Sequence, residues 1–287
     1  MGCGIVFLEE RGREMYPYTL FYNVNLYTVF LCLGILSAVV CYRIFADKLK
    51  MYWKVQNLVI MSTATAIIGG YFFAVLFQAL YNIEKRGGFI MDSSTGATFY
   101  GGLIGGAACF LAFYFLVGPL YVKDKRHLDS FFTVADIGAA SIAVAHGLGR
   151  IGCLMAGCCH GGATDEWYGI EMIYVGENGV AKYVKNVPVQ LYEALFLFLL
   201  FGFLVYRLIK RKTYGLPIYM AVYGVWRFAI EYARTDDRGS TVVDFLSPSQ
   251  FIAVLMIVGS VILYFGQRYY LKRRAIKYSA QEVSNEK

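Results

Sequence analysis

Seven long apolar runs divide this chain, and they leave little choice of fold other than a bundle of membrane-spanning helices. A helix needs about 20 mostly apolar residues to cross a bilayer. Only 16% of the residues are charged and 58% are hydrophobic, which is too little charge to cover a soluble protein. The expected spans are residues 19–43, 57–82, 98–122, 131–150, 189–208, 216–232 and 250–271. The sequence therefore predicts an all-α integral membrane protein with seven transmembrane helices.

The basic residues predict how these helices are oriented. The net charge of +7 is concentrated after the first, third, fifth and seventh spans, while the alternate loops hold most of the acidic residues. Lys and Arg are enriched in cytoplasmic loops, so we expect the N-terminus outside and the C-terminus in the cytoplasm. The charge is thus explained by topology and does not indicate nucleic-acid binding. We expect one integral membrane domain over residues 1–278, followed by a polar C-terminal tail over residues 279–287.

The longest segment outside the expected spans covers residues 162–188, between the fourth and fifth spans. By the predicted topology it forms a small extracytoplasmic cap. Residues 168–173 alternate in polarity, and Glu177-Asn178-Gly179 is a turn signal. This pattern predicts a short β-hairpin.

The fourth span ends in an unusual polar run, H-G-L-G-R-I-G-C-L-M-A-G-C-C-H-G, over residues 146–161. Ionisable groups such as Arg150 are costly inside a membrane and commonly mark a substrate or ion site. Five glycines in the run allow the backbone to approach a ligand closely. The run therefore predicts a polar site for an anionic ligand. Two other polar residues of this span have structural explanations as alternatives to a role in the site. His146 could be a core histidine that donates to a backbone carbonyl, and Asp136 could start or pack a helix.

The sixth span carries a second polar pattern, in which Tyr223, Arg227, Glu231 and Arg234 recur at spacings of four, four and three residues. This spacing places all four on one face of a helix and allows Arg227 to pair with Glu231. A structural ion pair that holds helices together is the alternative. The excess of arginine over carboxylate favours an anion site, because guanidinium groups fit phosphate in a fork geometry.

Three cysteines, Cys153, Cys158 and Cys159, and the neighbouring His160 raise the question of a metal site. Their spacing matches no usual zinc pattern, so we expect no metal and the three cysteines to be replaceable together. A nucleophilic thiol is the alternative, since a helix end and Arg150 would lower a thiol pKa.

Two further blocks stand at span ends. The third span opens with F-Y-G-G-L-I-G, whose glycines suit close helix packing but leave Tyr100 unexplained. The fifth opens with P-V-Q-L-Y-E, which suits a capped helix start with Tyr192 as an interfacial anchor. Glu193 would lie within a turn or two of the outer surface, a position that would allow it to be solvated.

These blocks, in this order, resemble the prolipoprotein diacylglyceryl transferase family. The family is a seven-span bacterial plasma-membrane enzyme that moves the diacylglyceryl group of phosphatidylglycerol to the lipobox cysteine thiol of a prolipoprotein. The resemblance implies the partners phosphatidylglycerol, prolipoprotein signal peptides and membrane lipids, and no metal or organic cofactor. It implies a catalytic set of Tyr100, Tyr223, Arg227 and Glu231, and a substrate-binding set of Tyr27, Arg150, Gln190, Arg227 and Arg234.

The resemblance also implies roles. Arg150 and Arg227 would hold the lipid phosphate, Glu231 would orient Arg227, and Tyr100 would assist the incoming thiol. The chain departs from the family at Tyr100, where a histidine is usual, and near Tyr71, where an arginine is common. It departs again where the family has two asparagines and a glutamate, at Cys153, Ala156 and Cys158. The alternatives are a relative that transfers to a different acceptor, and a non-catalytic phospholipid-binding or transport protein.

Overall fold

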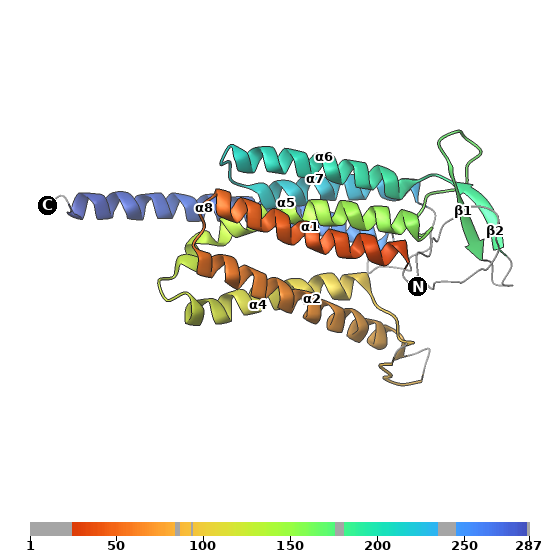
Figure 1. The fold of residues 1–287 in the computed structure, drawn as a ribbon, viewed down its shortest axis with the longest axis horizontal. Coiled ribbons are helices and arrows are strands. Elements are labelled where there is room, and N and C mark those ends of the chain that lie inside the picture. The colour runs from red at the N-terminus through yellow and green to blue at the C-terminus, as the bar shows by residue number, and fades with distance from the viewer. Residues whose placement is uncertain (1–24, 84–86, 93, 176–180, 235–244, 286–287) are drawn as a thin grey trace. The chain divides into compact units, whose positions relative to one another are not determined.

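The computed structural model describes residues 25–83, 87–92, 94–175, 181–234 and 245–285 (Figure 1). This part of the chain is almost entirely helical. Its seven α-helices are α1 (Leu26–Lys48), α2 (Trp53–Tyr81), α4 (Phe99–Tyr121), α5 (Arg126–Met155), α6 (Val189–Ile209), α7 (Gly215–Ile230) and α8 (Pro248–Asn285). Six of them are long and apolar enough to cross a membrane, and α7 is the short one with 16 residues. The predicted helical, multi-pass membrane architecture is confirmed.

The ends of the helices differ from the predicted spans by several residues. Helix α1 extends to Lys48, and the predicted start of the first span at residue 19 lies outside the described residues. Helix α5 continues past Arg150 to Met155. Helix α8 continues to Asn285, so residues 279–285 of the predicted tail are helical in backbone. The sidedness of the helices stays a prediction.

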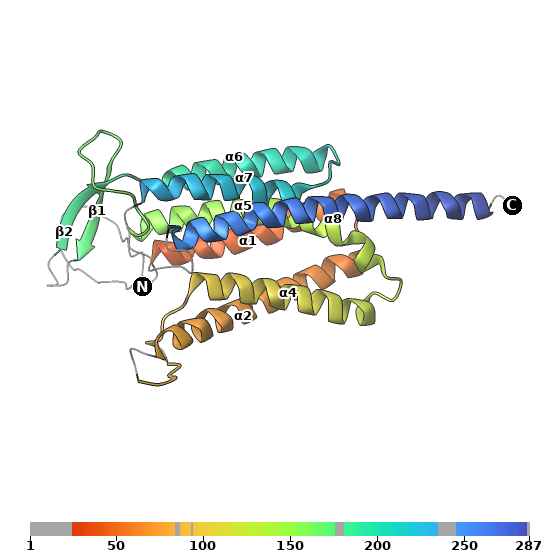
Figure 2. The ribbon, with the colours of Figure 1, turned by 180° about the vertical axis from the view of Figure 1, so that it is seen from behind.

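The predicted hairpin is present between α5 and α6. Strands β1 (Ile170–Val175) and β2 (Ala181–Asn186) pair antiparallel, with Ile170 opposite Asn186 and Val175 opposite Ala181. Figures 1 and 2 show the hairpin beyond the ends of α5 and α6. The predicted turn at residues 177–179 lies outside the described residues.

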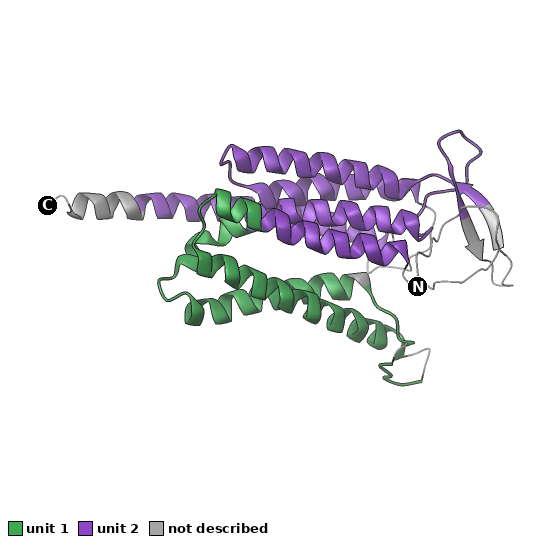
Figure 3. Ribbon diagram, viewed as in Figure 1, with its two compact units in different colours: residues 1–6, 43–134 green, residues 7–42, 135–287 purple. Residues whose placement is uncertain are grey.

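The structure divides into two compact units (Figure 3). One unit contains residues 43–134, with α2, α4 and the adjoining ends of α1 and α5. The other contains the described residues up to 42 and from 135 onward, with most of α1 and α5 and all of α6, α7 and α8. The organisation as a single domain over residues 1–278 stays a prediction.

In the first unit, α2 and α4 lie side by side (Figures 1 and 2) because glycines remove side chains from their contact. A Cβ added at Gly70 would lie 3.1 Å from the carbonyl oxygen of Gly102, and one at Gly106 would lie 3.1 Å from that of Ala66. Backbones this close are the usual product of small residues at membrane helix interfaces. The predicted packing role of the glycines at the start of the third span is confirmed.

In the second unit, Asp136 joins three helices. Its Oδ1 accepts a hydrogen bond from the backbone N–H of Leu216 in the first turn of α7, at 3.1 Å. Its Oδ2 accepts one from Gln267 of α8, at 3.5 Å. Asp136 thereby satisfies one of the donors that every helix start leaves without an intrahelical partner. The packing role considered for Asp136 from sequence is confirmed.

We predict that Gly101→Ala lowers the free energy of unfolding by about 1–3 kcal/mol, the range for overpacked sites. The new Cβ would lie 2.8 Å from the carbonyl oxygen of Phe73 and 2.8 Å from the Cβ of Phe77. The backbone of Phe73 cannot move aside cheaply. Thermal unfolding in detergent provides the measurement. The matched control is Gly138→Ala, where nothing lies within 4 Å, so alanine should be neutral or stabilising by up to about 1 kcal/mol. Equal midpoints for the two variants would contradict this account of the α2–α4 contact.

Candidate functional site

A buried carboxylate, Glu193, lies at the centre of the candidate site. It comes from the first turns of α6 and its side chain is fully buried. The Tyr223 hydroxyl of α7 donates to its Oε1 at 2.8 Å. Arg150 of α5 forms an ion pair with its Oε2, with 3.0 Å between Nε and the oxygen. His146 Nε2 lies 3.9 Å from Oε1. One carboxylate thus holds side chains from α5 and α7 against α6.

Glu193 is not solvated, although its place near the predicted outer surface would have allowed it to be. Helix α6 buries one face from its first turn, and this face carries Gln190, Glu193, Ala194, Leu197 and Leu200. The spacing of three, one, three and three residues is that of a helix stripe facing the protein interior. The apolar residues one and two turns later on the same face, Leu197 and Leu200, indicate that Glu193 faces the protein interior. His146 faces this carboxylate and the ring of Tyr223, with 4.9 Å between the ring centroids.

A second ion pair lies one turn further along α7. Arg227 Nη2 lies 2.7 Å from Glu231 Oε2, as the i, i+4 spacing predicts. The same nitrogen donates to Ser249 Oγ at 2.7 Å, and Ser247 Oγ donates to Glu231 Oε1 at 2.8 Å. Arg227 Nη1 is buried and has no hydrogen-bond partner among the described residues. The pair therefore leaves guanidinium donors available to a ligand.

Ser247 and Ser249 are members of this site that the sequence interpretation missed. The signal was present as Ser247-Pro248-Ser249-Gln250. Ser247 Oγ accepts from the Gln250 backbone N–H at 3.2 Å, and Gln250 Oε1 accepts from the Ser247 backbone N–H at 3.1 Å. This is a reciprocal capping box with proline at the first helical position. It fixes the start of α8 beside Arg227 and Glu231.

Arg234 lies elsewhere than predicted. Helix α7 ends at Ile230, a 3₁₀ turn follows over Glu231–Ala233, and Arg234 is extended with φ −97° and ψ 147°. It therefore does not continue the helix face of Tyr223 and Arg227. Instead its backbone forms an antiparallel bridge with Gly161, beyond the end of α5. A Cβ on Gly161 would lie 2.7 Å from the Ala233 carbonyl oxygen, so this approach requires glycine.

Of the other predicted site residues, two join the second unit's cluster. Tyr27 lies in the first turn of α1 and packs against Gly152 of α5. A Cβ added at Gly152 would lie 3.4 Å from the Tyr27 ring, so Tyr27 lies beside the helical turn that follows Arg150. Gln190 is buried and donates through Nε2 to the Cys158 carbonyl oxygen at 2.5 Å. Tyr100 is half-buried in the first turn of α4 and belongs to the first unit, as does the exposed Tyr71 of α2.

The three cysteines converge despite their unpromising spacing. The sulfur atoms of Cys153, Cys158 and Cys159 all lie within 4.8 Å of one another. Hydrogen bonds from the Cys153 and Cys158 thiols, with help from the nearby Arg234 guanidinium, hold the pKa of the Cys159 thiol well below its ordinary value despite burial. The sequence spacing, which matches no usual zinc pattern, did not indicate this convergence, and the expectation that no metal binds here stays a prediction.

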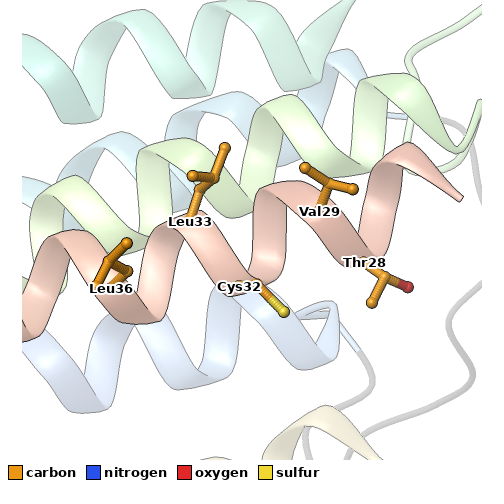
Figure 4. A pocket seen from close by; sticks show the side chains of 5 residues that line it. All are labelled: Thr28, Val29, Cys32, Leu33 and Leu36. Carbon is orange, nitrogen blue, oxygen red and sulfur yellow. The ribbon is translucent and has the colours of Figure 1, made fainter. Parts of the chain in front are cut away.

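An apolar hollow runs along α1 and is lined by Thr28, Val29, Cys32, Leu33 and Leu36 (Figure 4). All five side chains come from two and a half turns of one helix, and none is charged. Such a lining suits hydrocarbon better than a polar ligand. Tyr27, at the adjoining position of α1, connects this hollow to the turn after Arg150.

Comparison with known proteins identifies the family. A sequence model of prolipoprotein diacylglyceryl transferase matches residues 18–266. The chain belongs to the prolipoprotein diacylglyceryl transferase family. It is 32% identical over 213 residues to phosphatidylglycerol–prolipoprotein diacylglyceryl transferase 2 of Clostridium perfringens, covering 74% of this chain and 78% of the relative. It is 31% identical over 247 residues to the Clostridium tetani enzyme, covering 85% and 93%. No solved structure matches it significantly.

Family membership confirms the resemblance that rested on the four sequence blocks. Three of those blocks meet in the second unit: the run around Arg150, the start of α6 and the polar face of α7. Their contact through Glu193 gives a physical reason why they occur together in one chain. The block that contains Tyr100 belongs to the other unit.

We predict that Glu193→Gln lowers the free energy of unfolding by about 3–5 kcal/mol, the cost of leaving a buried charge without its partner. Arg150 would lose its counter-charge, and Tyr223 would lose a charged acceptor. Thermal unfolding in detergent tests this. Glu171→Gln, at an exposed position of β1, is the matched control and should change stability by less than about 0.5 kcal/mol. If both variants unfold at the wild-type temperature, Glu193 does not hold the three helices together.

Proposed function

We propose that this protein transfers the diacylglyceryl group of phosphatidylglycerol to the lipobox cysteine thiol of prolipoproteins. In the reaction the cysteine sulfur attacks the glycerol carbon that bears the phosphate. A carbon–sulfur bond forms, the carbon–oxygen bond to phosphate breaks, and glycerol phosphate leaves with the proton lost by the thiol. The relatives from Clostridium perfringens and Clostridium tetani carry the name of this activity.

One observation carries the proposal: Arg227 is buried, is held on one side by Glu231 and Ser249, and keeps Nη1 without a partner among the described residues. A guanidinium group binds phosphate oxygens in a fork geometry. We assign Arg227 to the lipid phosphate, with Glu231 as the group that orients it. Donors fixed in a site that excludes water stabilise the charge that develops on the leaving phosphate.

The other residues receive supporting roles. Arg150 binds the phosphate beside Arg227 and is held in place by Glu193. Tyr223 is hydrogen-bonded to Glu193 and positions it. Tyr27, Gln190 and Arg234 contribute to substrate binding around the segment that follows α5. Tyr100 assists the thiol by hydrogen bonding or proton transfer, in the place where the family usually has histidine.

We place the protein in the bacterial plasma membrane, with the N-terminus and the cap over residues 162–188 outside and the C-terminus in the cytoplasm. The basic residues after alternate spans support this orientation. Prolipoprotein signal peptides would then meet the site within the bilayer, together with the lipid donor. The apolar hollow along α1 offers a surface for an acyl chain of that donor.

A direct assay tests the activity against its rivals. Purified protein in detergent is incubated with phosphatidylglycerol labelled in the acyl chains and with a lipobox peptide. We expect a thioether-linked diacylglyceryl peptide and free glycerol phosphate, both absent when the peptide cysteine is replaced by serine. Lipid that binds without turnover would favour a phospholipid-binding or transport protein. Glycerol phosphate released without a labelled peptide would indicate a different acceptor.

We predict that Arg227→Ala abolishes transfer and that Arg227→Lys does not restore it. Lysine keeps the charge but lacks the planar fork, so it cannot bind Glu231 and phosphate at once. The assay above gives the rate, and the binding of labelled lipid is followed in parallel. Lys54→Arg, an exchange at a basic residue of the first unit, should leave transfer unchanged. Near-normal turnover of Arg227→Lys would exclude a phosphate clamp at this position.

We also predict that Tyr100→Phe lowers turnover by at least about tenfold, the lower range for losing one proton-transfer or hydrogen-bond partner. Lipid binding should change little, because arginines bind the phosphate. Tyr100→His restores the usual residue of the family and should be at least as active as the wild type. Tyr192→Phe, at the start of α6, serves as the control for loss of a tyrosine hydroxyl. Normal turnover of Tyr100→Phe would remove Tyr100 from the mechanism.

A further inference from the structure

The segment that follows α5 is a Schellman turn, and this turn brings the three cysteines together. The backbone N–H of Cys158 donates to the carbonyl oxygen of Cys153 at 3.1 Å, and that of Gly157 donates to Leu154 at 3.0 Å. Gly157 has φ +64°. This pair of hydrogen bonds around a left-handed glycine is the defining pattern of the motif. It reverses the chain, so Cys158 returns to the level of Cys153, in the last turn of the helix.

Cys159 then takes a backbone conformation that is rare for its residue type. Its φ of +65° lies in the left-handed region, which costs free energy for any residue with a Cβ and is enriched at functional sites. In this conformation its sulfur joins those of Cys153 and Cys158, with all three within 4.8 Å of one another. A loop that served only to connect α5 to the hairpin would more cheaply use glycine at this position.

Contacts from other elements fix the same loop. Gln190 of α6 donates to the Cys158 carbonyl oxygen at 2.5 Å. The backbone N–H of Gly161 donates to Val187 at 2.9 Å, and Gly161 also bridges Arg234. The thiols are therefore held by a preorganised backbone and do not meet by chance on a loose segment. A preorganised set of ligands is what a metal site requires.

We propose that Cys153, Cys158 and Cys159 bind one soft, thiophilic cation of the Zn²⁺ or Cu⁺ class through their three sulfur atoms. Metal–sulfur bonds of about 2.3 Å place two sulfurs on one zinc ion about 4 Å apart. The three sulfur atoms lie within 4.8 Å of one another, which is within about 1 Å of this value. Thiolate ligands select Cu⁺ and Zn²⁺ over hard cations such as Mg²⁺ or Ca²⁺.

The charged residues near the three thiols are compatible with a bound cation. Arg150, one turn before Cys153, is already neutralised by Glu193, so its charge does not add to that of a cation. With Zn²⁺, three thiolates leave one excess negative charge, which the Arg234 guanidinium beside Cys159 offsets. With Cu⁺ the excess is two charges, and Arg234 offsets one of them. The bound ion would pin the segment that carries the Gly161–Arg234 bridge beside the anion-binding arginines. Metal binding by these thiols does not require the proposed transferase reaction, although Arg234 borders both sites.

The test uses full-length protein in detergent, stripped of metal by a chelator and kept reduced. Added Zn²⁺ competes with a chromophoric chelator, and bound metal is counted by elemental analysis after gel filtration. We expect one equivalent per wild-type chain. The triple variant Cys153→Ser/Cys158→Ser/Cys159→Ser should bind at least about 100-fold more weakly, since even lost secondary contacts cost 10–100-fold in affinity. Cys32→Ser/Cys109→Ser, which removes two free cysteines outside the cluster, should bind as the wild type does.

A second measurement tests the proposal even if the triple variant fails to fold. Cd²⁺ titration of the wild type and of each single variant, Cys153→Ser, Cys158→Ser and Cys159→Ser, reports thiolate–metal charge-transfer absorption directly. We expect saturation at one equivalent in the wild type and a smaller amplitude in every single variant. Zn²⁺ should also raise the unfolding temperature of the wild type and leave that of the single variants less changed. Equal Zn²⁺ binding by wild-type and triple-variant chains, or an unchanged Cd²⁺ amplitude in the single variants, would overturn the proposal. So would a disulfide between two of the three cysteines that persists under the reducing conditions of the assay.

Discussion

The ion pair between Glu193 and Arg150 is the interaction on which the second unit depends. Neither charge could remain in an apolar helix bundle alone, because the desolvation penalty of an unpaired buried ion is several kcal/mol. Together they neutralise each other at 3.0 Å. The pairing fixes the rotation of α5 against α6, and the Tyr223 hydrogen bond to the same carboxylate fixes that of α7. Arg227, one turn beyond Tyr223, owes its position to this register.

Helix α5 (Arg126–Met155) carries two polar anchors, Asp136 about three turns after its start and Arg150 near its end. Asp136 accepts hydrogen bonds from the backbone at the start of α7 and from a side chain of α8. Arg150 lies fourteen residues later, about 20 Å along the axis. It pairs with Glu193 near the start of α6. Apolar surfaces alone specify helix–helix register poorly in lipid, where hydrocarbon competes equally for them. A few buried polar contacts therefore determine which helix faces meet, and this explains how so apolar a chain forms a defined site.

The sequence was sufficient for what depends on hydrophobicity and on local pattern. The apolar runs identified the helices, alternation identified the hairpin, and i, i+4 spacing identified the Arg227–Glu231 pair. It failed where a residue's surroundings come from distant elements. Glu193 looked solvated because it stands near a helix end, yet its neighbours on the helix face carry it inside. Arg234 left the helix face because α7 ends at Ile230. The cysteines converge through a turn around Gly157, and the geometry of this turn depends on where α5 ends, which is Met155 and not the predicted residue 150.

The charge balance of the site explains how it can bind an anion without being unstable when empty. Arg150 is matched by Glu193 and Arg227 by Glu231, so these two pairs carry no net charge that would destabilise the fold. A guanidinium has five N–H donors, however, and a carboxylate uses only some of them. Arg227 Nη1 is such a remaining donor. In the proposed reaction the phosphate gains a second negative charge as its bond to glycerol breaks. Fixed donors interact more strongly with that state than with the intact lipid, and only such differential interactions lower the barrier.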